Sequence, residues 1–292
     1  MTEKYVVCFG EILWDNLISG RRLGGAPLNV CYHLNKLGVD SKIIAQVGGD
    51  QDGRDIIQEL KRLDIHSAYC SVSPNKPTST VEVLVDTSQD ISYDIREDVA
   101  WDYIESSPDI EQLVEGSAAL VFGSLIARHT VSRNTLYQLV RRSTFRVFDV
   151  NLRHPHYTQD LIINLLSITN LLKLNEAELK IISEWLDGGH LSMDRQVSML
   201  QERFPDIQEI ILTLGADGAR YYSGKTLFIV QGQPVEIKDT VGSGDAFLAG
   251  FLAYKLKGNT IPESLQAGIH LSSFVAGQQG ACPEYIPDAL KL

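Results

Sequence analysis

The chain of 292 residues is 44% hydrophobic and 22% charged, which is typical of a globular protein and excludes a largely disordered chain. Its formal net charge of −11 argues against a nucleic-acid-binding protein, because no basic excess is available to neutralise phosphates. No apolar run approaches the roughly 18 residues that a membrane-spanning helix needs, so we expect no contact with membranes.

Short apolar runs alternate along the chain with segments whose apolar residues recur at helical spacing. The runs predict strands at 5–9, 42–47, 118–122, 145–150, 170–174 and 209–214. The helical spacing predicts helices at 27–37, 52–63, 132–142, 176–185 and 194–204. Strands that alternate with helices predict a mainly parallel sheet covered by helices on both faces.

The segment 23–38 reads L-G-G-A-P-L-N-V-C-Y-H-L-N-K-L-G and predicts a bare turn followed by a helix. Asn29 lies at the opening of that helix, and its amide both donates and accepts hydrogen bonds, so it suits sugar hydroxyls. Asp15, just past the first strand, is a second candidate partner for a hydroxyl. Taken singly, each is better explained as a cap or turn residue.

One region breaks the alternation of strands and helices. In residues 79–86, Val81, Val83 and Val85 alternate with polar neighbours, and after a turn-rich stretch at 87–90 a return strand is predicted at 91–96. Residues 16–23 are candidates for another strand pair in the same small sheet. Such a sheet is expected either as a lid over an active site or as an edge extension or dimer contact. Arg96, at the end of the hairpin, is either a substrate contact or an exposed surface residue.

The segment 238–250 reads K-D-T-V-G-S-G-D-A-F-L-A-G and places Gly242, Ser243 and Gly244 at the entrance to a helix. Unpaired backbone N–H groups at this position favour an anion, and glycines allow a phosphate to approach closely. Asp245 would repel phosphate, so it is either the acceptor of a proton from an attacking alcohol or a stabilising carboxylate at the helix N-terminus. P-loop and early G-x-G-x-x-G patterns are absent, which argues against those nucleotide-binding folds.

The cysteine and histidine patterns predict no metal site built from these residues. The four cysteines, at positions 8, 31, 70 and 282, form no C-x-x-C pair, so we expect free thiols in a reducing compartment. His154 and His156 flank a proline instead of lying four residues apart on a helix face. No signal-peptide pattern precedes the first strand, so a cytoplasmic protein is expected.

The pairing of G-G-A-P-L-N-V with a downstream D-T-V-G-S-G-D-A-F-L-A-G resembles the two signatures of the PfkB, or ribokinase-like, carbohydrate kinases. The similarity runs in order over almost the whole chain and is strongest to the fructokinase branch. It implies a three-layer α/β fold with a mainly parallel central sheet and a small β-sheet lid. The expected division is a single domain over residues 1–292, with the lid at approximately 15–24 and 78–98. The resemblance also implies ATP and Mg²⁺ as cofactors, K⁺ as a candidate third, and a homodimer formed through the lid.

The resemblance further implies roles for individual residues. Asp245 is expected as the catalytic base, with the amides of Gly242, Ser243, Gly244 and Asp245 as the anion hole. The expected sugar contacts are Asp15, Gly25, Asn29 and Arg153, where Arg153 ends a D-V-N-L-R segment and is alternatively a surface residue. The expected nucleotide contacts are Lys173, Asn175, Thr213, Gly215, Gly218 and Gly244. Mg²⁺ is expected through water at Asn175 and Glu178, which are alternatively a helix cap and its first turn, and a monovalent cation is expected at Asp239.

The resemblance therefore implies an ATP-dependent kinase that phosphorylates a primary hydroxyl of a free sugar. The Ala-Pro pair after the two signature glycines resembles fructokinases and favours D-fructose, phosphorylated at O6. The nearest alternative is a 2-keto-3-deoxygluconate kinase, whose acid substrate would need a cation such as Arg96 or Arg153. A catalytically silent family member that binds or regulates is a further alternative, and the retention of Asp245 argues against it.

Overall fold

The computed structural model describes residues 5–17, 20–85 and 91–290. The strands of its main sheet are β1 (Val6–Phe9), β4 (Ser41–Gly48), β5 (Cys70–Ser73), β8 (Ala119–Gly123), β9 (Arg146–Asp149), β10 (Leu171–Asn175), β11 (Glu209–Thr213), β12 (Ala219–Ser223) and β13 (Thr226–Val230). They lie in the order β13-β12-β11-β10-β9-β8-β1-β4-β5. All neighbours are parallel except β11 with β12 and β12 with β13. The predicted mainly parallel sheet is confirmed.

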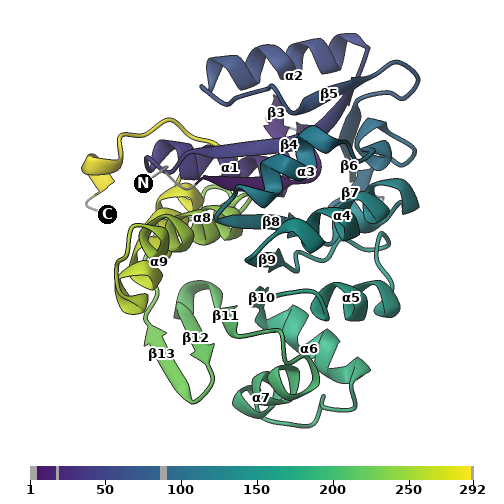
Figure 1. The fold of residues 1–292 in the computed structure, drawn as a ribbon. Helices are drawn as coiled ribbons and strands as arrows, with labels where there is room; N and C mark the ends of the chain where they lie inside the picture. Colours follow the sequence, from purple (N-terminus) through teal and green to yellow (C-terminus); the bar gives the residue numbers. More distant parts are fainter. Residues whose placement is uncertain (1–4, 18–19, 86–90, 291–292) are drawn as a thin grey trace.

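Helices cover both faces of this sheet (Figure 1). One face carries α1 (Ala26–Lys36), α2 (Gln51–Arg62), α8 (Ser243–Leu256) and α9 (Ile261–Ala276). The other carries α3 (Pro108–Glu115), α4 (Thr130–Arg142), α5 (Gln159–Leu166), α6 (Glu176–Trp185) and α7 (Met193–Arg203). Short 3₁₀ turns lie at Ala100–Tyr103, Leu125–Ala127, Gly215–Asp217 and Pro287–Leu290. Side chains of β1 alternate between the two layers, with Cys8 packed in the first and Phe9 in the second. The three-layer α/β class is confirmed.

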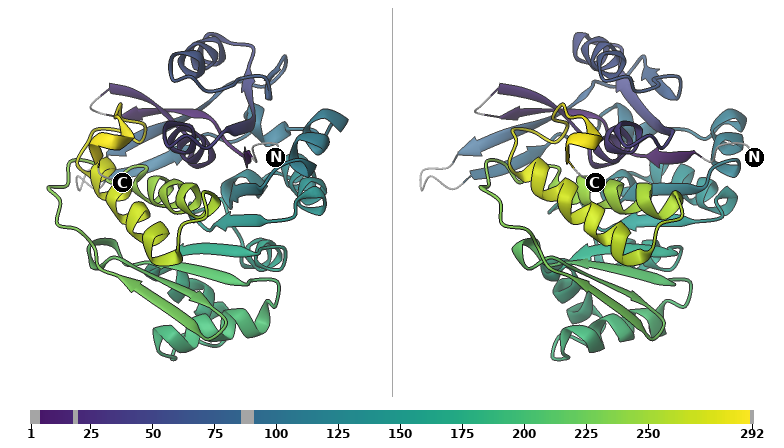
Figure 2. Two further views of the ribbon diagram at one scale, coloured as in Figure 1. Left: turned by 60° about the vertical axis from the view of Figure 1, so that its left-hand side comes forward. Right: turned by 90° about the vertical axis from the view of Figure 1, so that its left-hand side faces the viewer.

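A second, smaller sheet projects from this body (Figure 2). Its strands are β2 (Leu13–Leu17), β3 (Gly20–Gly24), β6 (Ser79–Val85) and β7 (Ile91–Ile95), in the order β3-β2-β6-β7. The predicted hairpin is the pair β6–β7, and the pair predicted near 16–23 begins earlier, at Leu13. The turn expected at 87–90 and Asp86 lie outside the described residues. The small sheet is thus confirmed, whereas the single-domain division and the lid role stay predictions.

The strands predicted for the main sheet, the strands of the hairpin and the five delimited helices are all present, with ends shifted by at most two residues. No bounds are predicted from the residue pattern for β5, β12, β13, α3, α5 or α9. Within the described ranges, no helix is long and apolar enough to cross a membrane.

The strand order determines where a site can form. After β1 the chain adds β4 on one side, whereas β8, β9 and β10 extend the sheet on the other side. In open α/β sheets, ligands bind beyond the carboxyl ends of the strands at such a change of direction. Asp149 and Asn175 end β9 and β10, so their side chains lie at this edge.

Candidate active site

The first turn of α8 presents free backbone donors. Gly242 precedes the helix at φ 76°, and a Cβ atom there would overlap Ala281, so only glycine fits. The N–H of Ser243 donates to Thr240 O (3.3 Å), whereas no described bond takes up the N–H of Gly244 or Asp245. Of the four amides expected to form an anion hole, the amide of Ser243 is therefore already bonded. The free N–H groups and the helix dipole together favour negative charge at this point.

Asp245 lies at this helix start and is only 8% exposed. The Nδ2 of Asn29, on the first turn of α1, donates to Asp245 Oδ2 (2.8 Å), and no described hydrogen bond reaches Oδ1. Burial and the nearby charge of Asp149 raise the pKa of Asp245 to about 6, against the opposing effects of Lys173, Asn29 and Arg153. The carboxylate is therefore mostly ionised at neutral pH and keeps one oxygen available to accept a proton.

A buried ion pair lies beside the helix start. Lys173 and Asp149 are register partners on β10 and β9, and Lys173 Nζ donates to both carboxylate oxygens of Asp149 (2.8 and 2.7 Å). Burial acts to lower the pKa of Lys173, but the attraction of Asp149 outweighs it and the pKa is raised. A Cβ atom on Gly244 would lie 3.3 Å from Lys173 Nζ, which places the ammonium group next to the free N–H groups.

Asn175 and Glu178 form a capping box at the start of α6. The N–H of Glu178 donates to Asn175 Oδ1 (2.9 Å), and the N–H of Asn175 donates to Glu178 Oε2 (2.9 Å). Leu152 N–H donates to Glu178 Oε1 (3.0 Å), so Glu178 also ties the 149–153 segment to α6. These two residues therefore do cap α6, as the alternative explanation expected. Their expected role toward Mg²⁺ stays a prediction.

The acidic groups around Lys173 indicate how the expected Mg²⁺ could be held. Burial and then the charge of Asp149 raise the pKa of Glu178, and the Asp245 charge also acts on Lys173. The Lys173 ammonium group thus pairs directly with Asp149 and also interacts electrostatically with Asp245 and Glu178. No cluster of three or more His, Cys, Asp or Glu in the described chain could hold a metal directly. The arrangement fits Mg²⁺ held through water and substrate phosphates, which is the usual habit of this ion.

Asp15 lies on β2 of the small sheet and Glu11 just before that strand, whereas Arg153 follows β9 of the main sheet. Burial raises the pKa of Asp15 to about 6, with Arg153 acting to lower it and Asp239 and Asp245 to raise it. Arg153 likewise acts to lower the pKa of Glu11 and of Asp245, so its positive charge reaches all three carboxyl groups, although its side chain is exposed. No ion pair of Arg153 is found in the described structure.

Gly25 precedes α1 and packs closely against the backbone of Glu11. Its φ of 121° is a glycine conformation, and a Cβ atom there would overlap Glu11 O. The glycine therefore allows the chain to turn tightly into the helix that carries Asn29, which is a structural requirement beside its expected contact with sugar.

Arg96 is the expected sugar residue that the structure does not bring to the others. Its side chain is exposed, and no described hydrogen bond or ion pair joins it to another candidate residue. Its carbonyl oxygen accepts from Arg128 Nη2 (2.7 Å), and Arg128 pairs with the buried Asp102 (2.8 Å). Asp102 and Arg128 also line a hollow of about 470 Å³ at this end of the molecule.

The expected nucleotide turn follows β11. The N–H of Leu214 donates to Gly218 O (2.8 Å) and closes the turn, while Thr213 Oγ1 donates to Leu174 O (3.4 Å). Gly215 (φ 58°) faces open space, whereas a Cβ atom on Gly218 (φ 101°) would overlap Val230 O. The turn is therefore closed tightly on one side and open on the other.

Asp239 lies on the segment that leads from β13 to α8. Its two carboxylate oxygens accept from Val241 N–H (3.0 Å) and Gly280 N–H (3.1 Å). Asp239 therefore ties this segment to the C-terminal residues, and its expected role toward a monovalent cation stays a prediction.

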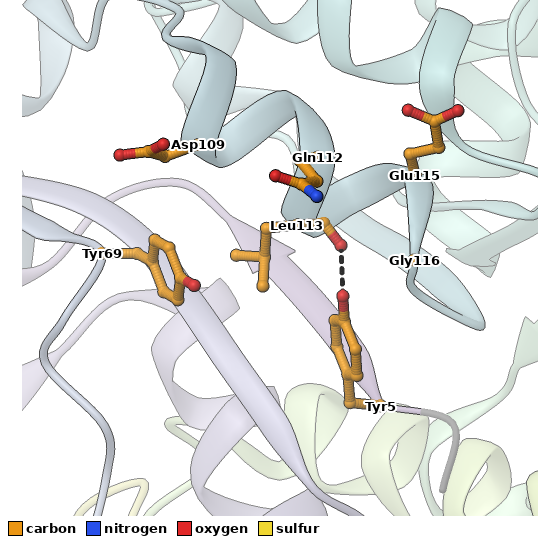
Figure 3. A pocket seen from close by; sticks show the side chains of 7 residues that line it. All are labelled: Tyr5, Tyr69, Asp109, Gln112, Leu113, Glu115 and Gly116. Carbon is orange, nitrogen blue, oxygen red and sulfur yellow. Dashed lines mark hydrogen bonds between the residues drawn. The ribbon is translucent and has the colours of Figure 1, made fainter. Parts of the chain in front are cut away.

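A separate pocket of about 760 Å³ is lined by none of these residues (Figure 3). Tyr5, Tyr69 and Gly116 in its wall precede strands, so the pocket lies at the amino ends of the sheet. Asp109 and Glu115 add negative charge, and Tyr5 donates to Leu113 O (2.8 Å). This lining provides no cationic group for a phosphate, which leaves the carboxyl end of the sheet as the candidate active site.

Three residues of the site were not among the predicted site residues. Asp149 begins the D-V-N-L-R segment that ends at Arg153, but only its register with Lys173 shows that the two form a pair. Glu11 follows the first strand, which was the one available signal for it. Cys282, whose thiol donates to Asn29 Oδ1 (3.4 Å), carried no signal in the sequence.

Glu11 gives rise to a testable dependence of stability on pH. It is 3% exposed, its Oε1 accepts from Ala26 N–H (3.2 Å), and burial raises its pKa from 4.5 to about 7. Between these two values the folded chain holds a proton that the unfolded chain releases, so this contribution to the free energy of unfolding is lost as the pH rises. We expect Glu11→Gln to match the wild type near pH 4 and to be more stable by about 3 kcal/mol at pH 8.

The measurement is urea unfolding of both proteins at pH 4, 6 and 8. Glu115→Gln, an exposed substitution of the same kind, is the matched control and should follow the wild type at each pH. A Glu11→Gln protein that is less stable than the wild type at pH 8 would contradict the inference that the buried charge of ionised Glu11 destabilises the fold.

Comparison with known proteins gives a consistent result. Residues 19–289 match the model of the pfkB family carbohydrate kinase. The ATP-dependent 6-phosphofructokinase of Thermoanaerobacterium thermosaccharolyticum is 28% identical over 309 aligned positions, covering 98% of this chain and 92% of that protein. The fructokinase of Salmonella typhimurium is 29% identical, covering 84% and 80%. The structure of a fructokinase with bound ATP from Xylella fastidiosa superposes with a TM-score of 0.87 at 18% identity, covering 99% and 98%, which shows a shared fold.

Proposed function

The chain belongs to the pfkB family of carbohydrate kinases, and from this premise we propose that it transfers the γ-phosphoryl group of ATP to O6 of D-fructose. The family and the ribokinase-like fold that the motifs implied are both confirmed. The observation that carries the proposal is the arrangement of Asp245 at the start of α8, bonded to Asn29 through one oxygen only, beside free N–H groups and Lys173.

The proposed reaction assigns a task to each of these groups. The O6 oxygen of the sugar attacks the γ-phosphorus and forms a new P–O bond, while the bond to the β–γ bridging oxygen breaks and ADP leaves. The hydroxyl proton passes to Asp245 Oδ1, because Oδ2 is already occupied by Asn29. The N–H groups of Gly244 and Asp245, together with Lys173, stabilise the negative charge of the phosphoryl group in transfer.

We place ATP along the turn that holds Thr213, Gly215 and Gly218, with its phosphates directed to the start of α8. The open side of Gly215 supports this placement. So do Val235 and Ile237, apolar residues that are 39% and 63% exposed on the segment leading to α8. Mg²⁺, when bound through water near Glu178 and Asn175, would supply positive charge to the phosphates. K⁺ at Asp239 is proposed only as an accessory ion.

The charges near Arg153 favour a neutral acceptor. Its positive charge already acts on Glu11, Asp15 and Asp245, and Asp15 would repel a carboxylate or phosphate. A second acceptor, 2-keto-3-deoxygluconate, is supported by one observation, namely that no described ion pair occupies Arg153. The relative named 6-phosphofructokinase makes fructose 6-phosphate the third acceptor to compare.

The test is steady-state kinetics of the purified protein with these three acceptors. We expect fructose to have the highest kcat/KM, with both anions lower by about tenfold or more, because each leaves one uncompensated polar mismatch. Asp15→Ala should lower kcat/KM for fructose and leave the KM for ATP unchanged. A preference for either anion would contradict the fructokinase proposal, and failure to release ADP with any sugar would favour a silent binding or regulatory member.

Two further proposals accompany this function. The small sheet acts as a lid over the sugar, and two copies pair through it to form a homodimer. Residence in the cytoplasm likewise stays a prediction.

A further inference from the structure

The C-terminal segment lies against α1 and is held there by consecutive contacts (Figure 2). The pairs are Tyr32 Oη with Pro283 O (2.7 Å), His33 Nε2 with Ala281 O (2.9 Å) and Lys36 Nζ with Glu284 Oε2 (2.8 Å). These bonds hold both sides of Cys282, the residue between Ala281 and Pro283. The backbone on either side of Cys282 is therefore held against α1, the helix that carries Asn29.

The thiol continues into the active site through one amide. Cys282 Sγ donates to Asn29 Oδ1 (3.4 Å), and Asn29 Nδ2 donates to Asp245 Oδ2 (2.8 Å). Burial, followed by the charges of Asp245 and Cys31, raises the pKa of the Cys282 thiol, so it stays protonated and remains a donor. A donor on one side and a carboxylate on the other allow only one orientation of the amide.

We propose that Cys282 is a positioning residue for phosphoryl transfer, because its thiol fixes the orientation of the Asn29 amide against the catalytic base. This inference rests on the proposed kinase function. With the amide reversed, Asn29 Oδ1 would face Asp245 Oδ2 and two acceptors would repel each other. The thiol disfavours this state by bonding to Oδ1, so that Asp245 keeps its donor and presents Oδ1 to the sugar hydroxyl.

The positioning role of Cys282 predicts a change in the pH dependence of kcat. The bond from Asn29 lowers the pKa of Asp245, since it stabilises the ionised form. A chain without the thiol donor holds this bond less firmly, so the pKa of Asp245 rises and the base is protonated at a higher pH. The acidic limb of kcat should therefore move upward, by roughly half a pH unit.

The test compares three substitutions at Cys282 with one at a buried cysteine elsewhere in the chain. Cys282→Ala and Cys282→Val remove the donor, and valine also preserves the packing, whereas Cys282→Ser keeps a hydroxyl donor. Cys70→Ala, on β5 away from the site, is the matched control. Measured quantities are kcat, the KM values for ATP and sugar, and the pH dependence of kcat from pH 5 to 8.5, with thermal unfolding to verify folding.

We expect Ala and Val to lower kcat about three- to tenfold and to shift the acidic limb, with the KM for ATP unchanged. Serine should restore both kcat and the limb, and Cys70→Ala should alter neither. An unshifted limb in Cys282→Val, or a serine variant as impaired as the valine variant, would overturn the positioning role. A wild-type protein that phosphorylates no sugar would instead overturn the proposed function, so the two failures are distinguishable.

Discussion

Asp245→Asn is expected to lower kcat by a factor of about 10² or more while ATP still binds. The amide has nearly the same shape as the carboxylate but cannot accept the proton of the sugar hydroxyl. The helix-start N–H groups and Lys173 are unchanged by the substitution, so the anion site stays intact. Removing a charge that repels phosphate should, if anything, strengthen the binding of ATP.

The measurement pairs steady-state turnover with the binding of ATP, followed by calorimetry. Asp160→Asn, on the exposed first turn of α5, removes the same charge far from the site and should leave turnover unchanged. Near-normal turnover of Asp245→Asn would eliminate Asp245 as the base. Loss of ATP binding together with turnover would point to a disturbed helix start instead.

Lys173→Met is expected to lower the free energy of unfolding by about 3–5 kcal/mol and to lower kcat/KM severely. The substitution leaves Asp149 buried without its partner, since the Lys173 ammonium donates to both of its carboxylate oxygens. It also removes the cation closest to the free N–H groups at the start of α8. Stability and activity therefore both decline, for two separate physical reasons.

A double substitution separates these two reasons. Lys173→Met with Asp149→Leu removes the whole ion pair, so no unpaired charge is left in the interior and most of the lost stability should return. The activity should stay low, because the cation is still absent from the phosphate site. Urea unfolding and steady-state kinetics on the single and double variants decide the matter. Recovered activity in the double variant would show that Lys173 serves only to neutralise Asp149.

The sequence predicted the fold well wherever a local pattern alone determines an element. The run 42–47 could be placed because its apolar residues are continuous, and α2 because its apolar side chains recur on one face. The edge strand β13 has no such pattern, since two of its apolar side chains, Leu227 and Ile229, are exposed. In α9, Gly268 interrupts the pattern because a close approach to Phe247 O of α8 leaves little room for a side chain.

The residues of the candidate site likewise divide into those that a local pattern predicts and those that only the tertiary structure brings together. Gly242 to Asp245 could be predicted because neighbouring residues build the anion site, so their spacing carries the information. The pair of Lys173 and Asp149 depends on the register of β9 and β10, which the residue pattern of either strand alone does not reveal. Arg96 shows the opposite limit: a charged residue at a strand end is no evidence that its side chain turns inward.

The bond between Asn29 and Asp245 joins residues 216 positions apart, and that between Cys282 and Asn29 joins residues 253 apart. Contacts of such high sequence separation form late, because long loops must close before the contacts stabilise anything. β1 likewise pairs with β8, which is synthesised more than a hundred residues later. A nascent chain on the ribosome therefore holds α1 long before it holds the base, and chemistry cannot begin until nearly all of the sequence has emerged.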